Sequence, residues 1–355
     1  FHGDMFEFIR NEVFDARNYF ATIVDPLHQN QFGGTIGGPI LIPHVYNGRN
    51  KTFFFFSYQG SRSAVPENST SCLCATPGNV TVFSSAERTG QFTGLSTATG
   101  RSAFPLAGDN GTTYPAGTPY STIFPNGQIP TADLNPLAIK LMNQFVPSPN
   151  APGNVYAFNP TLRGLDDQYI WRIDENITPQ DSAWAYGLWE RHPNTQTVPF
   201  TGATVPGFTE VDAEHIQEYT ADWNHIFNPN TLNEARFSYS RFNFASVSPQ
   251  TPLNPAKYGF TGVFPQTLSG ASLPVINVVG LFNLGFSSAG PQPRIDNVYV
   301  LSDNFSRIAG RHTLKLGFAM ERFAVFQPVS SNLSGTFYFT GGGAFPPDCP
   351  ARISY

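Results

Sequence analysis

The strongest constraint on the fold is a set of short segments in which apolar and polar residues alternate. The clearest is HTLKLGFAMER, in which one side carries Leu314, Leu316, Phe318 and Met320, and the other carries Lys315, Gly317, Ala319 and Glu321. A period of two places successive side chains on opposite faces of a β-strand. The alternating segments are roughly 9 to 12 residues long, which is the length that a tilted strand needs to cross a bilayer.

The same alternation recurs along much of the chain. The opposed sets are Phe6 and Phe8 against Glu7; Phe54, Phe56 and Tyr58 against Phe53, Phe55, Ser57 and Gln59; Tyr169, Trp171 and Ile173 against Gln168, Arg172 and Asp174; Trp184, Tyr186 and Leu188 against Ala183, Ala185 and Gly187; Tyr219, Ala221 and Trp223 against Thr220, Asp222 and Asn224; and Ala235, Phe237 and Tyr239 against Glu234, Arg236 and Ser238. An apolar side suits lipid, and a side with charged and small residues suits a watery or plugged interior.

Composition supports a membrane β-barrel over a soluble domain. Charged residues make up 13% of the chain, about half of the usual share, and aromatic residues make up 14%. A membrane helix needs about 18 consecutive apolar residues, and polar residues interrupt every stretch of this sequence. The net charge of -5 and the lack of a Lys/Arg cluster argue against nucleic acid as a partner.

The links between the alternating segments are short and long in turn. Short links run from Pro43 to Lys51 and through ENITPQD, FNPNT and AGRH, which carry the Asn, Pro, Asp and Gly that tight turns require. The long links span about 20 residues after Arg10, about 105 from Ser61 to Asp166, about 20 after Arg191 and about 45 from Ser246 to Pro293. Outer-membrane barrels have this arrangement, with the long loops outside the cell. A secreted carbohydrate-binding β-sandwich is the soluble alternative.

The longest loop, over residues 61–166, contains a predicted helix. Asn135 and Pro136 match an N-cap followed by proline at the first helical position, and Pro147 ends the run. Leu137, Leu141 and Phe145 recur every four residues between them. We expect one short amphipathic helix packed on the loop or on the barrel mouth, and an irregular, exposed remainder.

The glycine-rich segment GGTIGGPI, from Gly33 to Ile40, resembles a phosphate-binding loop only superficially. Such a loop requires a helix directly after it, and Pro39 followed by LIP opposes one. We interpret the segment as a strand in which Gly33 and Gly37 leave room for a plug to approach the wall. Phe32, Ile36 and Ile40 then face lipid.

No catalytic or metal site is evident in the sequence. The histidines (His2, His28, His44, His192, His215, His225 and His312) never pair at metal-ligand spacing. Glu190 beside Arg191, and Asp174 beside Glu175, are interpreted as charges that solvate the rim of the wall. Motifs of hydrolases, metalloproteases and nucleotide-binding proteins are missing. We therefore predict no enzyme activity, no metal and no cofactor.

The remaining candidates have two interpretations each. Cys72 and Cys74 either form a local disulfide or are free loop thiols, and the redox state of Cys349 is also open. Trp184, Tyr186 and Trp223, with Tyr169 and Trp171, fit an aromatic girdle on the periplasmic side. The loop aromatics either contact a ligand or pack the loops together; they are Tyr114, Tyr120, Phe124, Phe200 and Phe208.

The order of the motifs resembles one family of outer-membrane proteins. FHGDMFEFIRNEVFDARNYF, QNQFGGTIGGPI and KTFFFFSYQGSR are followed by SAERTGQFTGL, IPTADLNPLAIKLMNQFVPSPN, RIDENITPQDSAWAYGLWER, FNPNTLNEARFSYSRF and DNFSRIAGRHTLKLGFAMER. In this order the strings resemble the opening of the barrel in the Oar-like group of TonB-dependent receptors. The resemblance covers nearly the whole chain.

The resemblance implies a fold, a location and a set of partners. It implies an all-β protein of the outer membrane, with residues 1–355 as the N-terminal half of an antiparallel barrel that has about 10 of roughly 22 strands. Because the chain starts at Phe1 without a signal segment and ends without a closing strand, we expect the plug and the remaining strands to lie outside it. The implied partners are outer-membrane lipid, the protein's own plug domain, the TonB complex and an unknown extracellular solute. A surface adhesin, or a passive barrel without energy coupling, is the membrane alternative.

Overall fold

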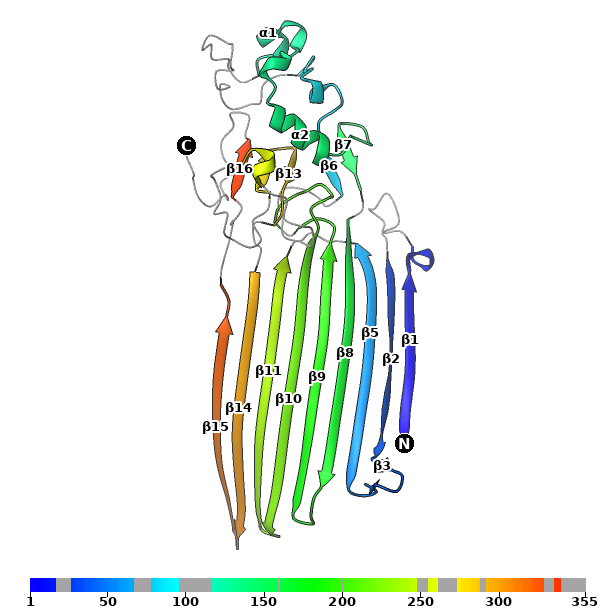
Figure 1. Cartoon of the computed structure of the whole chain (residues 1–355), viewed down its shortest axis with the longest axis vertical. Helices are drawn as coiled ribbons and strands as arrows, with labels where there is room; N and C mark the ends of the chain where they lie inside the picture. The colour runs from blue at the N-terminus through cyan, green and yellow to red at the C-terminus, as the bar shows by residue number, and fades with distance from the viewer. Residues whose placement is uncertain are drawn as a thin grey trace.

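The protein forms a single large antiparallel sheet with a smaller unit at one end, as a computed structural model shows (Figure 1). The structure describes residues 1–16, 27–66, 78–95, 117–158, 160–199, 201–247, 255–260, 273–287, 292–328 and 335–339. Nine strands lie in the order β1-β2-β5-β8-β9-β10-β11-β14-β15, so that neighbours in space are neighbours along the chain. The prediction of an antiparallel barrel wall is confirmed, with nine strands in the described residues where about ten were expected.

The two strands at the N-terminal edge of the wall have the predicted length, with 10 and 12 residues, and the other seven are longer, with 15 to 19. The nine strands are β1 (His2–Asn11), β2 (His28–Pro39), β5 (Thr52–Pro66), β8 (Thr161–Asn176), β9 (Asp181–Gln196), β10 (Glu210–Asn228), β11 (Thr231–Val247), β14 (Gln292–Ala309) and β15 (His312–Phe326). The extra residues continue the backbone ladder at the loop end. Beyond the hydrocarbon layer both faces of a strand contact water, so apolar and polar residues need not alternate there. The alternation in the sequence therefore ends before the backbone hydrogen bonds between the strands do.

The links alternate as predicted. Residues 177–180, 229–230 and 310–311 form tight turns at one end of the sheet, together with the segment that holds β3 (Leu41–Ile42) and β4 (Tyr46–Asn47). The strand ends that the long links join all lie at the opposite end of the sheet (Figure 1). We call these ends the turn end and the loop end.

The register separates the side chains into two faces, because residues paired across an antiparallel ladder point to the same side. Leu316 pairs with Phe305, Leu301 with Phe237, and Tyr239 with Tyr219. The same row continues through Gly187 to Trp171 and on to Phe56 and Ile36. We call this mostly apolar side the outer face. The inner face holds their sequence neighbours, among them Lys315, Arg236, Asp222 and Arg172.

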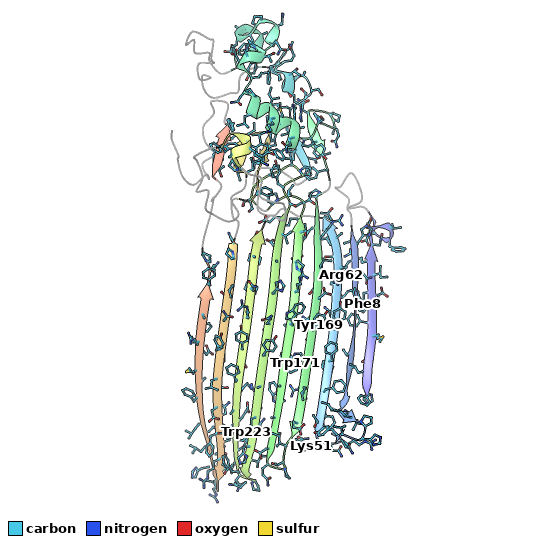
Figure 2. The ribbon with its side chains drawn as sticks, in the orientation of Figure 1. Phe8, Lys51, Arg62, Tyr169, Trp171 and Trp223 are labelled. Atoms are coloured by element: carbon cyan, nitrogen blue, oxygen red, sulfur yellow. The ribbon has the colours of Figure 1, made fainter. Side chains whose placement is uncertain are left out.

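Strand β9 departs from the interpretation of its aromatics as part of one girdle. Trp184 pairs with Asp222, and Tyr186 with Thr220, which places both rings on the inner face. Trp189, five residues beyond Trp184, lies on the outer face opposite Tyr169. Figure 2 also shows Trp223 near the turn end and Tyr169 and Trp171 further along the sheet. These aromatics therefore do not form one girdle.

The second unit is a cap built from the loops (Figure 1). It comprises residues 78–95, 117–158, 197–199, 201–209, 255–260, 273–287 and 335–339. Its elements are β6 (Asn79–Thr81), β7 (Val155–Ala157), α1 (Tyr120–Ile123), α2 (Pro136–Phe145), β12 (Val275–Val278), β13 (Phe282–Leu284), β16 (Thr336–Phe339) and the short 3-10 turns Glu87–Thr89, Pro125–Gly127, Thr131–Asp133 and Pro255–Tyr258. Strand β16 pairs in parallel with β12, which pairs antiparallel with β13.

The predicted loop helix is confirmed, and the prediction that the rest of the loop is irregular and exposed is wrong. Helix α2 has Pro136 at its start, and the Asn135 side chain accepts hydrogen bonds from the backbone N–H groups of Leu137 and Ala138. Val80, Val82 and Leu141, all from the longest loop, are buried in the core of the cap. Three loops that are far apart in sequence supply this core, so no local pattern reveals it.

The buried apolar side chains of the described residues lie in the cap and none lies in the nine strands of the wall. No second sheet packs on the wall within the described part of the chain, although the β-sandwich alternative requires one. A single layer with an apolar face and a polar face needs lipid on one side. No helix among the described residues is long and apolar enough to cross a membrane. Cys72, Cys74 and Cys349 lie outside the described residues.

Candidate functional site

The inner face of the wall is lined by polar groups that bind one another across the strands. The Arg236 guanidinium donates to Asp222 at 2.9 Å and to Glu234 at 2.7 Å. Gln168 donates to Glu190, and Gln196 donates to Asp212, both at 2.9 Å. These contacts give the charged side chains hydrogen-bond partners on the inner face itself, where no apolar core packs against them. The inner face can therefore border water or a polar protein surface.

Trp184 sits between two of these cations. The Arg172 guanidinium, on the neighbouring strand β8, lies 4.5 Å from the centre of a Trp184 ring, and the Arg236 guanidinium, on β11 beyond β10, lies 5.5 Å from it. The face of an indole attracts cations. This contact gives a physical reason for an aromatic residue on the polar side of β9.

The outer face is an apolar band with rings in contact from strand to strand. Tyr58 and Tyr169 have ring centres 4.9 Å apart, and Tyr239 and Tyr299 have ring centres 5.0 Å apart. Leu316 is 59% exposed and lies in a row of exposed apolar side chains on β15. Asp303 is a polar exception, and it accepts a hydrogen bond from Asn233 at 2.6 Å. Such an exposed apolar surface is characteristic of a face that contacts lipid.

The cap contains an apolar cavity of about 450 Å³. Helix α2 contributes Leu137, Ala138 and Met142 to its lining, and the small sheet contributes Ile276 and Phe282. Its other lining residues include Phe83, Phe92, Phe260 and Phe339. This volume and lining are typical of small-molecule sites.

The charged residues at the cavity wall are engaged in holding the cap together. Arg88 donates to the carbonyl oxygens of Phe83 and Val146, each at 3.0 Å, and burial lowers the pKa of its guanidinium. Glu87 accepts from the backbone N–H of Ser84 at 2.6 Å. The cavity therefore suits an uncharged apolar group rather than an ion.

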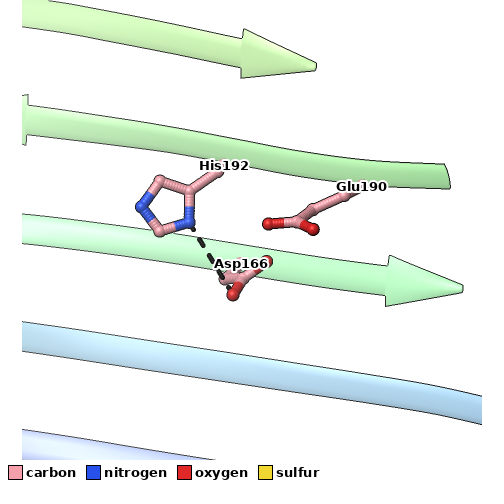
Figure 3. A group of neighbouring side chains, drawn as sticks. All are labelled: Asp166, Glu190 and His192. Atoms are coloured by element: carbon pink, nitrogen blue, oxygen red, sulfur yellow. Dashed lines mark ion pairs between the residues drawn. The ribbon is translucent and has the colours of Figure 1, made fainter. Parts of the chain in front are cut away.

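Near the loop end of the inner face, a histidine and two carboxylates converge (Figure 3). Asp166 on β8 and Glu190 and His192 on β9 have ligand atoms that all lie within 4.8 Å of one another. His192 Nδ1 is 3.7 Å from Asp166 Oδ2, and Asp166 Oδ1 is buried without a hydrogen-bond partner. Sequence reasoning missed this cluster because Asp166 is distant along the chain. The available signal was Glu190-x-His192, a spacing that puts both side chains on one face of a strand.

Comparison with known proteins identifies the class of membrane protein. The family described as outer membrane beta barrel domain matches residues 1–348. The chain belongs to this family. No curated protein and no solved structure matches the sequence. Membership places this outer-membrane β-barrel protein in the outer membrane, with the outer face of the wall against lipid. Because long barrel loops are extracellular, the cap and its cavity lie on the cell surface.

The loop aromatics of this barrel protein mainly pack the cap. Phe208 is 0% exposed and contacts Phe145 and Phe286, and Phe124 is also buried. Tyr120 contacts Phe92, which lines the cavity. Tyr114 and Phe200 lie outside the described residues.

Gly33 and Gly37 of the barrel wall lie on the inner face, as the plug interpretation requires, with Phe32 and Ile36 on the outer face. A β-carbon at Gly33 would overlap the ring of Phe6 from the neighbouring strand. The ring of Phe6 therefore takes up the space beside Gly33. The expectation that the apolar side of strand β1 faces lipid is wrong, because the register puts Phe6 and Phe8 on the inner face and Glu7 on the outer face. Ile40 lies just past the end of β2.

The absence of a bound metal stays a prediction for this barrel protein. A bound zinc ion would contradict this prediction, and the cluster of Asp166, Glu190 and His192 is where it would bind, since imidazole and carboxylate are ligands for zinc. Equilibrium dialysis of the intact protein against Zn²⁺ should give the same stoichiometry for the native protein and for His192→Ala. His225→Ala is the control, because His225 pairs with a single carboxylate, that of Asp181. Loss of one zinc only in His192→Ala would overturn the prediction.

Proposed function

We propose that this outer-membrane protein is a TonB-dependent receptor that captures a bulky solute at the cell surface and imports it through the barrel. The observation that carries the proposal is an apolar cavity in the cap at the loop end of a polar-lined wall. A cavity can bind the solute at the cell surface, and a polar inner face that is not filled by an apolar core can border the path of the solute through the barrel. The order of the sequence motifs supports this specific family within the outer-membrane barrels.

The cavity narrows the solute to compounds that carry an uncharged apolar part. Iron chelates, vitamin B12-like compounds, glycans and peptides are the candidate classes, and those with an apolar moiety fit best. We propose that the protein's plug domain occupies the polar inner face and that TonB delivers the energy to release the solute. We propose transport without catalysis.

Uptake of labelled solutes from each class tests the proposal in the source bacterium. One class should lose uptake when the gene is deleted and when TonB is inactivated. Uptake that needs the gene but continues without TonB would support the passive barrel instead. Unchanged uptake of every class, combined with lost surface attachment, would support the adhesin.

A pair of substitutions on α2 tests the role of the cavity. Ala138 lines the cavity, whereas Gln144 is an exposed residue of the same helix that does not line it. Ala138→Trp fills part of the space and should lower binding of the solute at least about tenfold, while Gln144→Trp should leave binding unchanged. Equal binding by both variants would remove the cavity from the proposal.

A further inference from the structure

Four strands of the wall carry an arginine at the same height on the outer face. Five strands run from the turn end to the loop end, namely β1, β5, β9, β11 and β15. The last four begin at Thr52, Asp181, Thr231 and His312. Ten residues beyond each start stand Arg62, Arg191, Arg241 and Arg322. The register places all four on the outer face, since Arg241 pairs with Gln217 and Arg322 with Tyr299.

The outward positions below each arginine are uncharged. They are Phe54, Phe56, Tyr58 and Gly60 in β5; Ala183, Ala185, Gly187 and Trp189 in β9; Asn233, Ala235, Phe237 and Tyr239 in β11; and Leu314, Leu316, Phe318 and Met320 in β15. Ten residues rise about 33 Å along a strand, or about 25 Å along the membrane normal at a tilt near 40°. That height equals the apolar band of an outer-membrane barrel. The arginines therefore mark the outer boundary of the hydrocarbon.

The partners of these arginines leave a net positive row. Arg62 donates to Asp167 at 2.6 Å, and Arg191 lies near the same carboxylate. Arg241 donates to the amide oxygen of Asn297 at 3.1 Å. Arg191 and Arg322 are exposed and have no hydrogen-bond partner within the described part of the chain. Two of the four guanidinium groups thus share one carboxylate, and Arg241 and Arg322 have no carboxylate partner within the described residues, at a surface where lipid headgroups begin.

We propose that this arginine row binds the phosphate groups of an outer-leaflet lipid, the lipid A part of lipopolysaccharide. A guanidinium matches phosphate with two parallel hydrogen bonds, and its flat, weakly hydrated shape suits an interface. The aromatic residues Tyr58, Trp189 and Tyr239, two or four positions below the arginines, contact the acyl chains at the same level. The row fixes the depth of the barrel in the membrane and recruits a shell of phosphorylated lipid.

Native mass spectrometry of the intact, detergent-solubilised protein with added lipid A tests this proposal. Each basic residue at a membrane surface contributes about a fivefold gain in binding, so Arg191→Gln with Arg322→Gln should weaken binding roughly 25-fold. Arg62 is left in place because it holds Asp167. The matched control is Arg307→Gln, an outer-face arginine two residues from the end of β14 at the turn end. It should bind lipid A as the native protein does.

Dephosphorylated lipid A tests the chemistry without any substitution. The native protein should bind it as weakly as the double variant binds the phosphorylated lipid. Equal binding of the two lipids by the native protein would overturn the proposal even if the double variant failed to fold. Native-level binding by the folded double variant would overturn it as well. Neither result bears on uptake of the solute, so these experiments do not test the proposed transport.

Discussion

At the scale of single residues, small side chains on the outer face make room for large neighbours. A β-carbon at Gly187 would overlap the indole of Trp171 on the adjacent strand, and the two residues are directly paired. The run of small residues in β9 therefore has a packing role on the lipid side. The sequence pattern alone associates small residues with the interior, because it does not show which ring lies beside them.

Gly187→Val should destabilise the folded barrel by about 1 to 3 kcal/mol, since the Trp171 ring has to move. Ala185→Val, two positions earlier on the same face, is the control. It adds methyl groups where a β-branched residue is favoured in a strand and should change the stability by less than about 0.5 kcal/mol. Urea titration of protein folded into lipid vesicles measures both. Equal losses would show that Trp171 does not occupy the space beside Gly187.

Leu316 and Lys315 test the two faces at neighbouring positions. Leu316→Arg puts a charge into hydrocarbon and should lower the free energy of unfolding by about 2 to 4 kcal/mol near the midplane. Lys315→Arg keeps a charge on the inner face and should be nearly neutral. The same vesicle titration applies. A large loss from Lys315→Arg would reverse the assignment of faces.

At the scale of elements, the strands show how far a period of two is informative. The alternation assigns Trp171 in β8, Trp223 in β10, Phe237 in β11 and Leu316 in β15 to the apolar face, and the register agrees. It is wrong for β9, where it puts Trp184 on the apolar side although the ring lies on the inner face, because both faces of that strand carry aromatic residues. Only the pairing with Asp222 decides the face, and pairing is a property of two strands.

Two tryptophans of β9 offer a direct test of this assignment. In variants that keep a single tryptophan, brominated lipids should quench Trp189 strongly and Trp184 weakly, because bromine quenches indoles that touch acyl chains. The 355-residue chain has four tryptophans, so three substitutions within it give each variant. Strong quenching of Trp184 would place its ring in lipid and separate it from Arg172.

At the scale of the whole molecule, stability comes from two different sources. The wall relies on its backbone ladder and on lipid, whereas the cap relies on its own buried core. Phe208→Ala should destabilise the cap by about 3 to 5 kcal/mol and leave the wall folded. Proteolysis should then cut the cap while the unheated barrel keeps its fast migration on a gel. Phe227→Ala is the control, since Phe227 is 58% exposed in the wall.

The wall was predictable from the sequence, and the cap was not. Helix α2 follows from Asn135 and Pro136, because capping is a local interaction. The cap core joins Val80, Leu141, Phe208 and Leu284 from three separate loops, and no local spacing relates them. The cluster of Asp166 with Glu190 and His192 also depends on a pairing between strands. Contacts of this kind require the three-dimensional structure.

The wall is a single layer of β-strands, and this affects how the sequence of such a protein can evolve. A substitution on the lipid side meets acyl chains, and its neighbour in sequence meets the barrel interior, with no shared packing between them. Selection can therefore alter the chemistry of the barrel interior while leaving the insertion of the barrel into the membrane intact. Along any one strand, residues at odd and even positions can therefore evolve independently of each other.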